Sequence, residues 1–216
     1  MRALLDSPTI TYCEAAIDSI VKRPWYALSN LAFFIAAFLI YRTEKTSLAR
    51  RFAVVTALVG GLSLIYDANY TYLSQLFDLS GMLLFVNLLL FLNLQRLYPA
   101  FKSLRWLIAA SLTSLAAIVY FGAYAGNFVF GLYVVTVIVT EIILLKTKKH
   151  NNSKLWYIAL AVFAAGFAVW LFDASKVICF DFGLLNGRAI FHYTSAIVMY
   201  QMFNFYRLQT VPNKRQ

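Results

Sequence analysis

Seven long apolar stretches are the feature that most limits what this chain can fold into. A helix of about 20 apolar residues crosses the roughly 30 Å hydrocarbon core of a bilayer. Backbone amides must be satisfied internally in lipid, so such stretches form helices. The stretches are Trp25–Tyr41, Phe52–Tyr66, Tyr72–Leu94, Leu104–Tyr124, Phe128–Leu145, Leu155–Phe172 and Ala189–Tyr206. We therefore predict an all-α fold, a bundle of seven transmembrane helices.

Composition supports a membrane protein of one domain. The 216 residues are 62% hydrophobic and 13% charged, whereas soluble domains are about 45–50% apolar and about 25% charged. We expect an extracytoplasmic segment at 1–24, a membrane domain at 25–206 and a cytoplasmic tail at 207–216. No GxGxxG or GxxxxGK[ST] loop indicates nucleotide chemistry. The net charge is +10, and the basic residues behind it flank the apolar stretches. Such residues indicate membrane topology rather than a nucleic-acid partner.

The distribution of basic residues predicts the orientation. The odd-numbered connections and the tail hold 14 of the 19 Lys and Arg residues, and the other side holds 5. Cytoplasmic loops accumulate Lys and Arg, so the N-terminus is expected outside and the C-terminus in the cytoplasm, which requires an odd number of spans. The expected location is a bacterial inner membrane or the ER or Golgi membrane, with the chain crossing it several times.

Polar and charged residues within or beside the stretches gather at one depth. A charged side chain at the bilayer centre costs about 2.5–3.5 kcal/mol on insertion scales, so each is a candidate functional residue. In the predicted orientation six such residues lie toward the outer leaflet: Ser63, Asp67, Asp78, Asp173, Arg188 and His192. For Asp173 and Arg188, near the ends of stretches, an interfacial or snorkelling side chain is the alternative. We predict one shared polar pocket.

The two cysteines, Cys13 and Cys179, are both expected outside. An oxidising compartment permits a disulfide between them, which would tie the N-terminal segment over the mouth of the pocket. Two unpaired buried thiols are the alternative. Glu141 stands alone near the cytoplasmic end of the fifth stretch, where we expect it to reach the interface or to pair with Lys146.

Short motifs along nearly the whole chain carry a family resemblance. In order, they are Tyr12-Cys13-Glu14, Pro24-Trp25, Ser29-Asn30-Leu31-Ala32-Phe33, Gly61-Leu62-Ser63 with Tyr66-Asp67, then Asp78, Asp173, Cys179, and Gly187-Arg188-Ala189-Ile190-Phe191-His192. Together they resemble the alkaline ceramidases. These belong to a superfamily of seven-helix membrane hydrolases that includes the adiponectin receptors.

The resemblance implies zinc-dependent hydrolysis of the ceramide amide, with the metal held by three histidines. Ser63 and Asp78 match the residues that assist at the metal-bound water or the oxyanion, and His192 matches the last zinc histidine. The other two histidine positions hold Asp67 and Arg188. Aspartate can bind zinc, but a guanidinium has no free lone pair, so only Asp67 and His192 could bind a metal. We expect an Asp67–Arg188 ion pair to pin the second and seventh spans instead.

The resemblance also implies a calcium site in the N-terminal segment. Glu14 matches one of its carboxylates. Arg23 stands where the family has a glutamate, and Tyr26 stands where an asparagine is usual. A basic residue opposes a divalent cation, so we do not expect calcium.

Three classes of function remain open. The first is a pseudoenzyme that binds a sphingolipid-like or other membrane amphiphile. The second is an active, metal-dependent amide hydrolase in which Arg188 stabilises an oxyanion or grips a headgroup. The third is a transporter, which should place polar residues across the full membrane depth. No soluble partner is implied.

Overall fold

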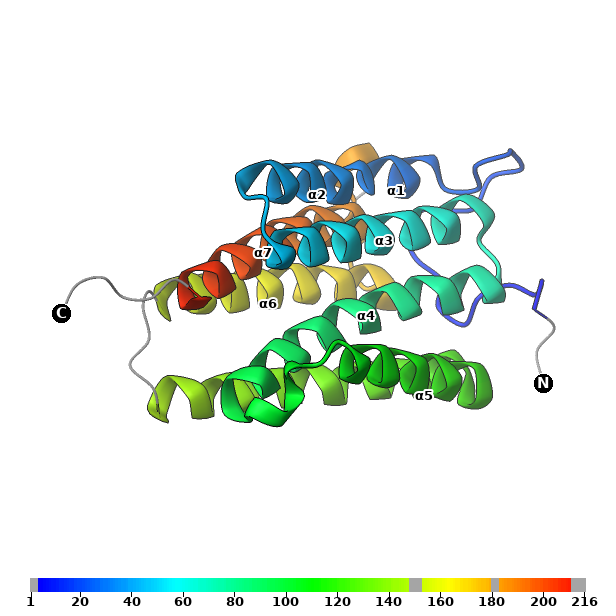
Figure 1. Ribbon diagram of the computed structural model, residues 1–216. Coiled ribbons are helices and arrows are strands. Elements are labelled where there is room, and N and C mark those ends of the chain that lie inside the picture. Colours follow the sequence, from blue (N-terminus) through cyan, green and yellow to red (C-terminus); the bar gives the residue numbers. More distant parts are fainter. Residues whose placement is uncertain (1–3, 148–152, 180–182, 211–216) are drawn as a thin grey trace.

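The computed structural model describes residues 4–147, 153–179 and 183–210. In these residues the regular secondary structure is entirely helical, which confirms the predicted all-α class. The helices are α1 (Pro24–Ser29), α2 (Leu31–Thr43), α3 (Ser47–Asn69), α4 (Tyr72–Leu97), α5 (Arg105–Thr147), α6 (Ser153–Ser175) and α7 (Gly187–Thr210), with 3-10 helices η1 (Pro99–Lys102) and η2 (Gly183–Leu185). The long helices lie side by side in one bundle (Figure 1).

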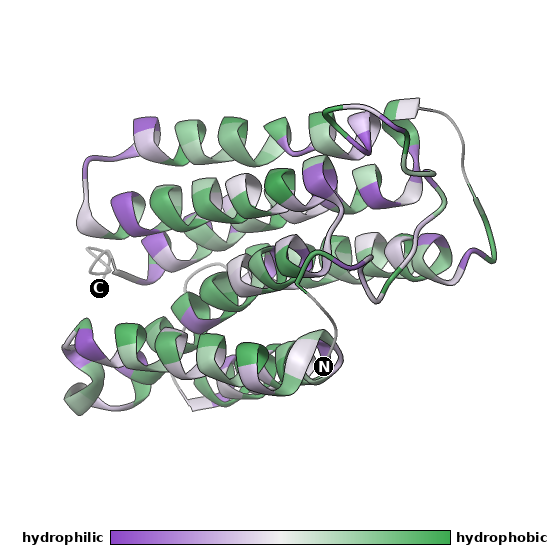
Figure 2. Cartoon of the chain, turned by 90° about the vertical axis from the view of Figure 1, so that its right-hand side faces the viewer, coloured by the Kyte–Doolittle hydropathy of each residue, from purple (hydrophilic) through white to green (hydrophobic). Residues whose placement is uncertain are grey.

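The helices have the apolar surfaces of membrane-spanning segments. Five segments of the described chain are long and apolar enough to cross a membrane: Pro24–Thr43, Ser47–Asn69, Tyr72–Leu97, Arg105–Thr147 and Ser153–Ser175. Hydrophobic residues cover most of each helix (Figure 2). Large apolar side chains face outward on α5, among them Val119, Tyr120 and Phe128. Such a surface is typical of contact with lipid, and the chain is a multi-pass membrane protein.

Helix α5 breaks at Gly122 and folds back on itself (Figure 1). A straight helix of its 43 residues would be about 65 Å long, twice the bilayer core. Gly122 has φ 80°, a conformation that glycine adopts readily because it has no Cβ. Tyr72 of α4 accepts a hydrogen bond from the Ala123 amide at 3.2 Å. The predicted connection, between Tyr124 and Phe128, is therefore wrong by a few residues, because backbone conformation and not polarity decides where the chain reverses.

A contact across the break proves the hairpin. The Ser114 hydroxyl lies 3.3 Å from the Tyr133 hydroxyl. In a straight helix, 19 residues would separate these positions by about 28 Å. The two halves of α5 are thus antiparallel neighbours.

Most of the main core comes from α2, α3, α4 and α7, with further buried residues from α5 and α6, and within it Phe52 packs against Phe85, Phe203 and Tyr206. Helix α7 contacts α1, α2, α3 and α6. It is not among the five apolar segments. Its first turns instead deliver polar side chains to the bundle interior.

The N-terminal segment lies across one end of the bundle (Figure 1). Its backbone forms hydrogen bonds with the end of α3 and the start of α4. The Tyr72 amide donates to the Asp6 carbonyl, and the Lys22 amide donates to the Ala68 carbonyl. The predicted disulfide is confirmed, because Cys13 is bonded to Cys179. The segment is therefore fixed over the ends of α3, α6 and α7.

Candidate functional site

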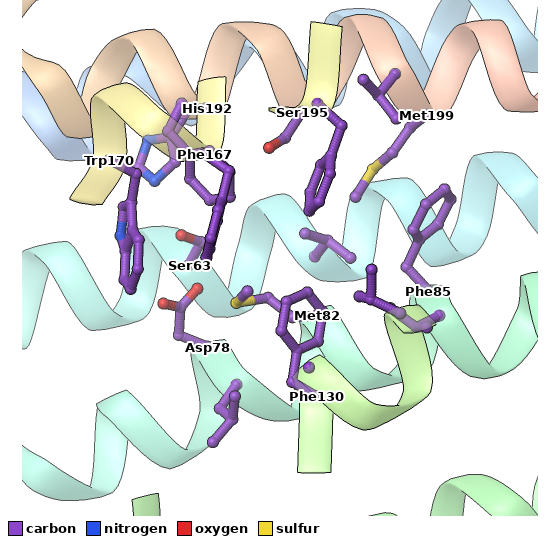
Figure 3. A pocket seen from close by; sticks show the side chains of 18 of the residues that line it. Ser63, Asp78, Met82, Phe85, Phe130, Phe167, Trp170, His192, Ser195 and Met199 are labelled. Carbon is purple, nitrogen blue, oxygen red and sulfur yellow. The ribbon is translucent and has the colours of Figure 1, made fainter. Parts of the chain in front are cut away.

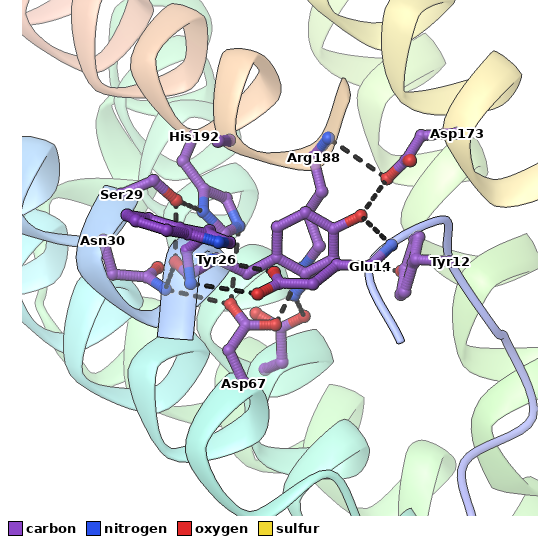
Figure 4. Close-up of polar contacts among 12 residues, drawn as sticks. Tyr12, Glu14, Tyr26, Ser29, Asn30, Asp67, Asp173, Arg188 and His192 are labelled. Carbon is purple, nitrogen blue, oxygen red and sulfur yellow. Dashed lines mark hydrogen bonds and ion pairs between the residues drawn. The ribbon is translucent and has the colours of Figure 1, made fainter. Parts of the chain in front are cut away.

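Arg188 is the centre of a buried polar network at this end of the bundle (Figure 4). Its Nε lies 2.9 Å from Oδ1 of Asp67 on α3, and its Nη2 lies 3.0 Å from Oδ2 of Asp78 on α4. Its Nη1 donates to the Tyr12 hydroxyl at 2.9 Å. The side chains of Arg188 and Asp67 are 3% and 0% exposed. One guanidinium thus joins three separate parts of the chain, including the expected ion pair with Asp67.

Asp173 fixes the start of α7. Its Oδ2 accepts hydrogen bonds from the Arg188 amide at 3.1 Å and from the Tyr26 hydroxyl at 2.8 Å. Gly187 makes this approach feasible, because a Cβ there would lie 2.6 Å from Cβ of Asp173. Asp173 is 1% exposed. The alternative of interfacial side chains is therefore wrong for both Asp173 and Arg188.

His192 lies one turn beyond Arg188 and bonds to α1. Its Nδ1 is 2.6 Å from the Ser29 hydroxyl, which donates to the Tyr26 carbonyl at 2.7 Å. When Ser29 donates to the Tyr26 carbonyl, the matching tautomer of His192 carries its proton on Nδ1 and donates it to Ser29. Nε2 lies 3.9 Å from Oδ2 of Asp67, too far for a hydrogen bond. This nitrogen is left as an acceptor.

A cavity of about 440 Å³ begins at this network and runs between α3, α4, α5, α6 and α7 (Figure 3). Ser63, Asp78 and His192 line its polar end, and Arg188 also borders it. Ser63 is 3% exposed, and its hydroxyl makes no hydrogen bond to another described residue. Most of the remaining wall is apolar, for example Met82, Phe85, Phe130, Phe163, Phe167 and Met199.

A second polar cluster, outside the residues that line this cavity, joins α4, α5 and α7. Tyr206 donates to the carbonyl of Leu89, a wall residue, at 3.4 Å and to Oδ1 of Asn93 at 2.7 Å. Glu141 accepts from Arg96 at 2.7 Å and its side chain is 0% exposed. Burial shows that Glu141 does not reach the interface, and its ion-pair partner on α4 replaces the expected Lys146.

Comparison with known families agrees with this geometry. The family model described as ceramidase matches residues 6–215. This chain belongs to the ceramidase family. No curated protein matches it. Ceramidase-family membership fits the apolar cavity with a polar end, and it makes the metal site the next question.

The residues at the polar end do not fit the zinc site implied by the ceramidase resemblance. Zinc needs at least three protein ligands with free lone pairs. In the described residues no group of three or more His, Cys, Asp or Glu side chains is placed to hold a metal ion. Oδ1 of Asp67 is bonded to Arg188, and its Oδ2 accepts from the Asn30 amide at 2.9 Å. A fixed cation therefore stands among the remaining candidate ligands.

In the N-terminal segment, the Glu14 carboxylate hydrogen-bonds to the first turn of α1. Both Glu14 oxygens accept backbone hydrogen bonds, from Trp25 and Tyr26, at 3.0 Å each. Burial raises the pKa of Glu14, and these hydrogen bonds oppose the shift. Arg23 is 1% exposed, and its guanidinium lies 3.4 Å from the centre of the Tyr70 ring. A cation held by aromatic stacking lies next to the carboxylate that the resemblance assigns to calcium.

Four site residues received no role in the sequence analysis: Tyr12, Tyr26, Ser29 and Asn30. Tyr12, Ser29 and Asn30 stood within motifs that carried the resemblance, and Tyr26 was noted only where the calcium site usually has an asparagine. Their roles depend on contacts with α3, α6 and α7. Ser29 and Asn30 lie at the junction of α1 and α2, where a short interruption brings their side chains to His192 and Asp67.

Proposed function

We propose that this ceramidase-family protein binds a sphingolipid-like or other membrane amphiphile in the cavity and lacks the zinc-dependent hydrolysis. Arg188 is the observation that carries this proposal. Its guanidinium takes a position where the resemblance expects a zinc histidine, and its three nitrogens already donate to Asp67, Asp78 and Tyr12. A protonated guanidinium cannot bind a metal and repels one nearby.

The shape and lining of the cavity support an amphiphilic ligand. Its volume of about 440 Å³ lies within the range of about 300–1,000 Å³ for small-molecule sites. Polar groups gather at one end, and the wall beyond them is mainly apolar. A headgroup can therefore hydrogen-bond at the polar end while an alkyl chain replaces water along the apolar wall.

A second candidate function is hydrolysis of a linear lipid amide at an altered metal site. Ser63, Asp78 and His192 favour it, because all three line one cavity. It would require Asp67 to exchange its ion pair with Arg188 for a metal ion. That exchange takes from the buried guanidinium one of its two carboxylate partners, which is costly. We therefore rank it second.

Metal content and amide hydrolysis distinguish the two functions. In chelator-free protein we expect far less than one zinc per chain, both in the wild type and in Asp67→Ala and His192→Ala. Ceramide should remain uncleaved even with added zinc. Native mass spectrometry should detect one bound amphiphile, which Met82→Trp should displace by filling the cavity. Near-stoichiometric zinc that is lost in both alanine variants, together with ceramide cleavage, would establish the hydrolase instead.

We further propose seven spans with the N-terminus outside. The hairpin halves of α5 and the packed helix α7 would bring the five apolar segments to seven. The Cys13–Cys179 bond supports the orientation, because disulfides persist in oxidising, non-cytoplasmic compartments.

The disulfide gives a direct test of this orientation. In protein taken from its native membrane, a maleimide reagent should label two thiols per chain only after reduction. In the Cys13→Ser/Cys179→Ser background, a single cysteine at position 19 should be labelled from outside, and one at position 45 only after permeabilisation. The reverse labelling pattern would invert the proposed topology.

A further inference from the structure

We infer that the cavity selects an amphiphile with one alkyl chain and a protonated primary amine as its headgroup. The inference rests on the proposed function, because it assumes that the cavity holds a lipid. It follows from the surplus of carboxylates and the free acceptor atoms at the polar end.

Carboxylates outnumber cations around the polar end. Both Asp67 and Asp78 pair with the single positive charge of Arg188, at 2.9 and 3.0 Å. Asp173 adds a third carboxylate, whose hydrogen-bond donors are all neutral: the Tyr26 hydroxyl and the backbone amides of Arg188 and Cys13. Negative charge within an apolar bundle is costly unless a cation offsets it. An ammonium headgroup supplies that cation.

The other nearby cation does not remove this surplus. Arg23 lies outside the cavity wall, stacked on Tyr70. Its charge acts on both Glu14 and Asp67. Two cations, Arg23 and Arg188, therefore stand against four carboxylates, those of Glu14, Asp67, Asp78 and Asp173, and negative charge remains in excess.

Three acceptors face the space that a headgroup would enter (Figure 3). Asp78 is 13% exposed and borders the cavity, whereas its neighbour Asp67 is 0% exposed. The Ser63 hydroxyl borders the same space and has no hydrogen-bond partner among the described residues. Nε2 of His192 is an acceptor in the tautomer that donates from Nδ1 to Ser29. An ammonium group has three N–H donors, which matches these three acceptors in number.

An anionic headgroup meets unfavourable charge at the polar end. Three of the five N–H donors of the Arg188 guanidinium are bonded to protein oxygens, and two of these oxygens belong to carboxylates that offset its charge. A carboxylate or phosphate would instead lie against Asp78, and like charges at close range repel strongly where water is excluded. A neutral alcohol could hydrogen-bond but would leave the negative surplus in place.

The cavity volume favours one chain over two. At about 440 Å³ it falls in the lower part of the range for small-molecule sites, about 300–1,000 Å³. Phe130, Phe163 and Phe167 border the route from the polar end. A single flexible alkyl chain fits between such walls without displacing a helix.

Matched probes test this selectivity on the full chain in one neutral detergent. The probes are hexadecylamine, hexadecanol and hexadecanoate, which differ only in their headgroups. We expect the amine to bind at least tenfold more tightly than either of the others. Asp78→Asn should remove most of that preference by weakening amine binding about tenfold, a change of about 1.4 kcal/mol, with little effect on hexadecanol.

Asp18→Asn is the matched control. It removes the same charge from the same end of the protein, but Asp18 is fully exposed outside the cavity, so amine affinity should not change. If hexadecanoate binds as tightly as the amine, or Asp78→Asn leaves the preference intact, the amine inference is wrong and the lipid cavity stands. If none of the three probes binds, the proposed function and this inference both fail.

Discussion

Arg188→Ala is expected to lower the free energy of unfolding of the detergent-purified protein by about 3–5 kcal/mol. The change leaves Asp67 at 0% exposure without its cation, and it also removes the partners of Asp78 and Tyr12. A buried charge without a partner costs its full desolvation free energy, which is the reason for so large an effect. Denaturant unfolding in a fixed detergent, followed by circular dichroism, measures it.

A double-mutant cycle separates the interaction free energy of this ion pair from the other effects of each substitution on stability. Asp67→Ala should be less destabilising, because Arg188 keeps its ion pair with Asp78. The double variant should lose less stability than the two single losses added together, since it no longer leaves Asp67 buried without a cation. Simple additivity would show that Asp67 and Arg188 do not act as a unit. Lys22→Ala, which breaks the exposed Lys22–Asp18 pair, is the control and should cost less than about 1 kcal/mol.

Combining Asp67→His with Arg188→His is expected to create a zinc site. With His192 unchanged, three imidazoles would converge where one guanidinium now joins α3 and α7, and three protein ligands plus water form the usual catalytic zinc geometry. The measured zinc content should rise from far below one zinc per chain to nearly one. Ser63 and Asp78 remain at the cavity, so ceramide cleavage is expected with the metal.

The single change Arg188→His is the control for this gain. It leaves an aspartate at position 67 and removes the cation that neutralises it, so zinc binding should be weaker than in the double variant. Zinc content that does not rise in the double variant, with the fold intact by circular dichroism, would contradict the view that Arg188 occupies the metal position. Equal zinc in the wild type would contradict it as well.

Some of the site could be predicted from residue types alone. Charged side chains are expensive in a membrane, so Asp67, Asp78, Asp173 and Arg188 stood out as candidates, and the structure brings them together. The pairing of Asp67 with Arg188 was predicted only from the family resemblance, which expects zinc histidines at these two positions. The even number of cysteines on one predicted side suggested the disulfide that is present.

The contacts that assemble the site could not be predicted in this way. Tyr12 and Ser29 are ordinary residues in the sequence, and their partners Arg188 and His192 lie 176 and 163 residues away. Hydrophobicity locates a span but carries no information on which side chain of another helix it will meet. Glu141 likewise has its ion-pair partner, Arg96, on a neighbouring helix.

The sequence by itself determined the helical membrane class and the family, because apolar length and the order of short motifs are properties of the chain alone. Tertiary structure decided where α5 reverses, since one glycine at φ 80° and the Tyr72 hydroxyl of α4 fix that break. It also decided that Arg188 donates hydrogen bonds to two carboxylates and a tyrosine at once. These contacts depend on how separate helices pack around one buried charge, and only the folded bundle brings those groups within hydrogen-bond distance.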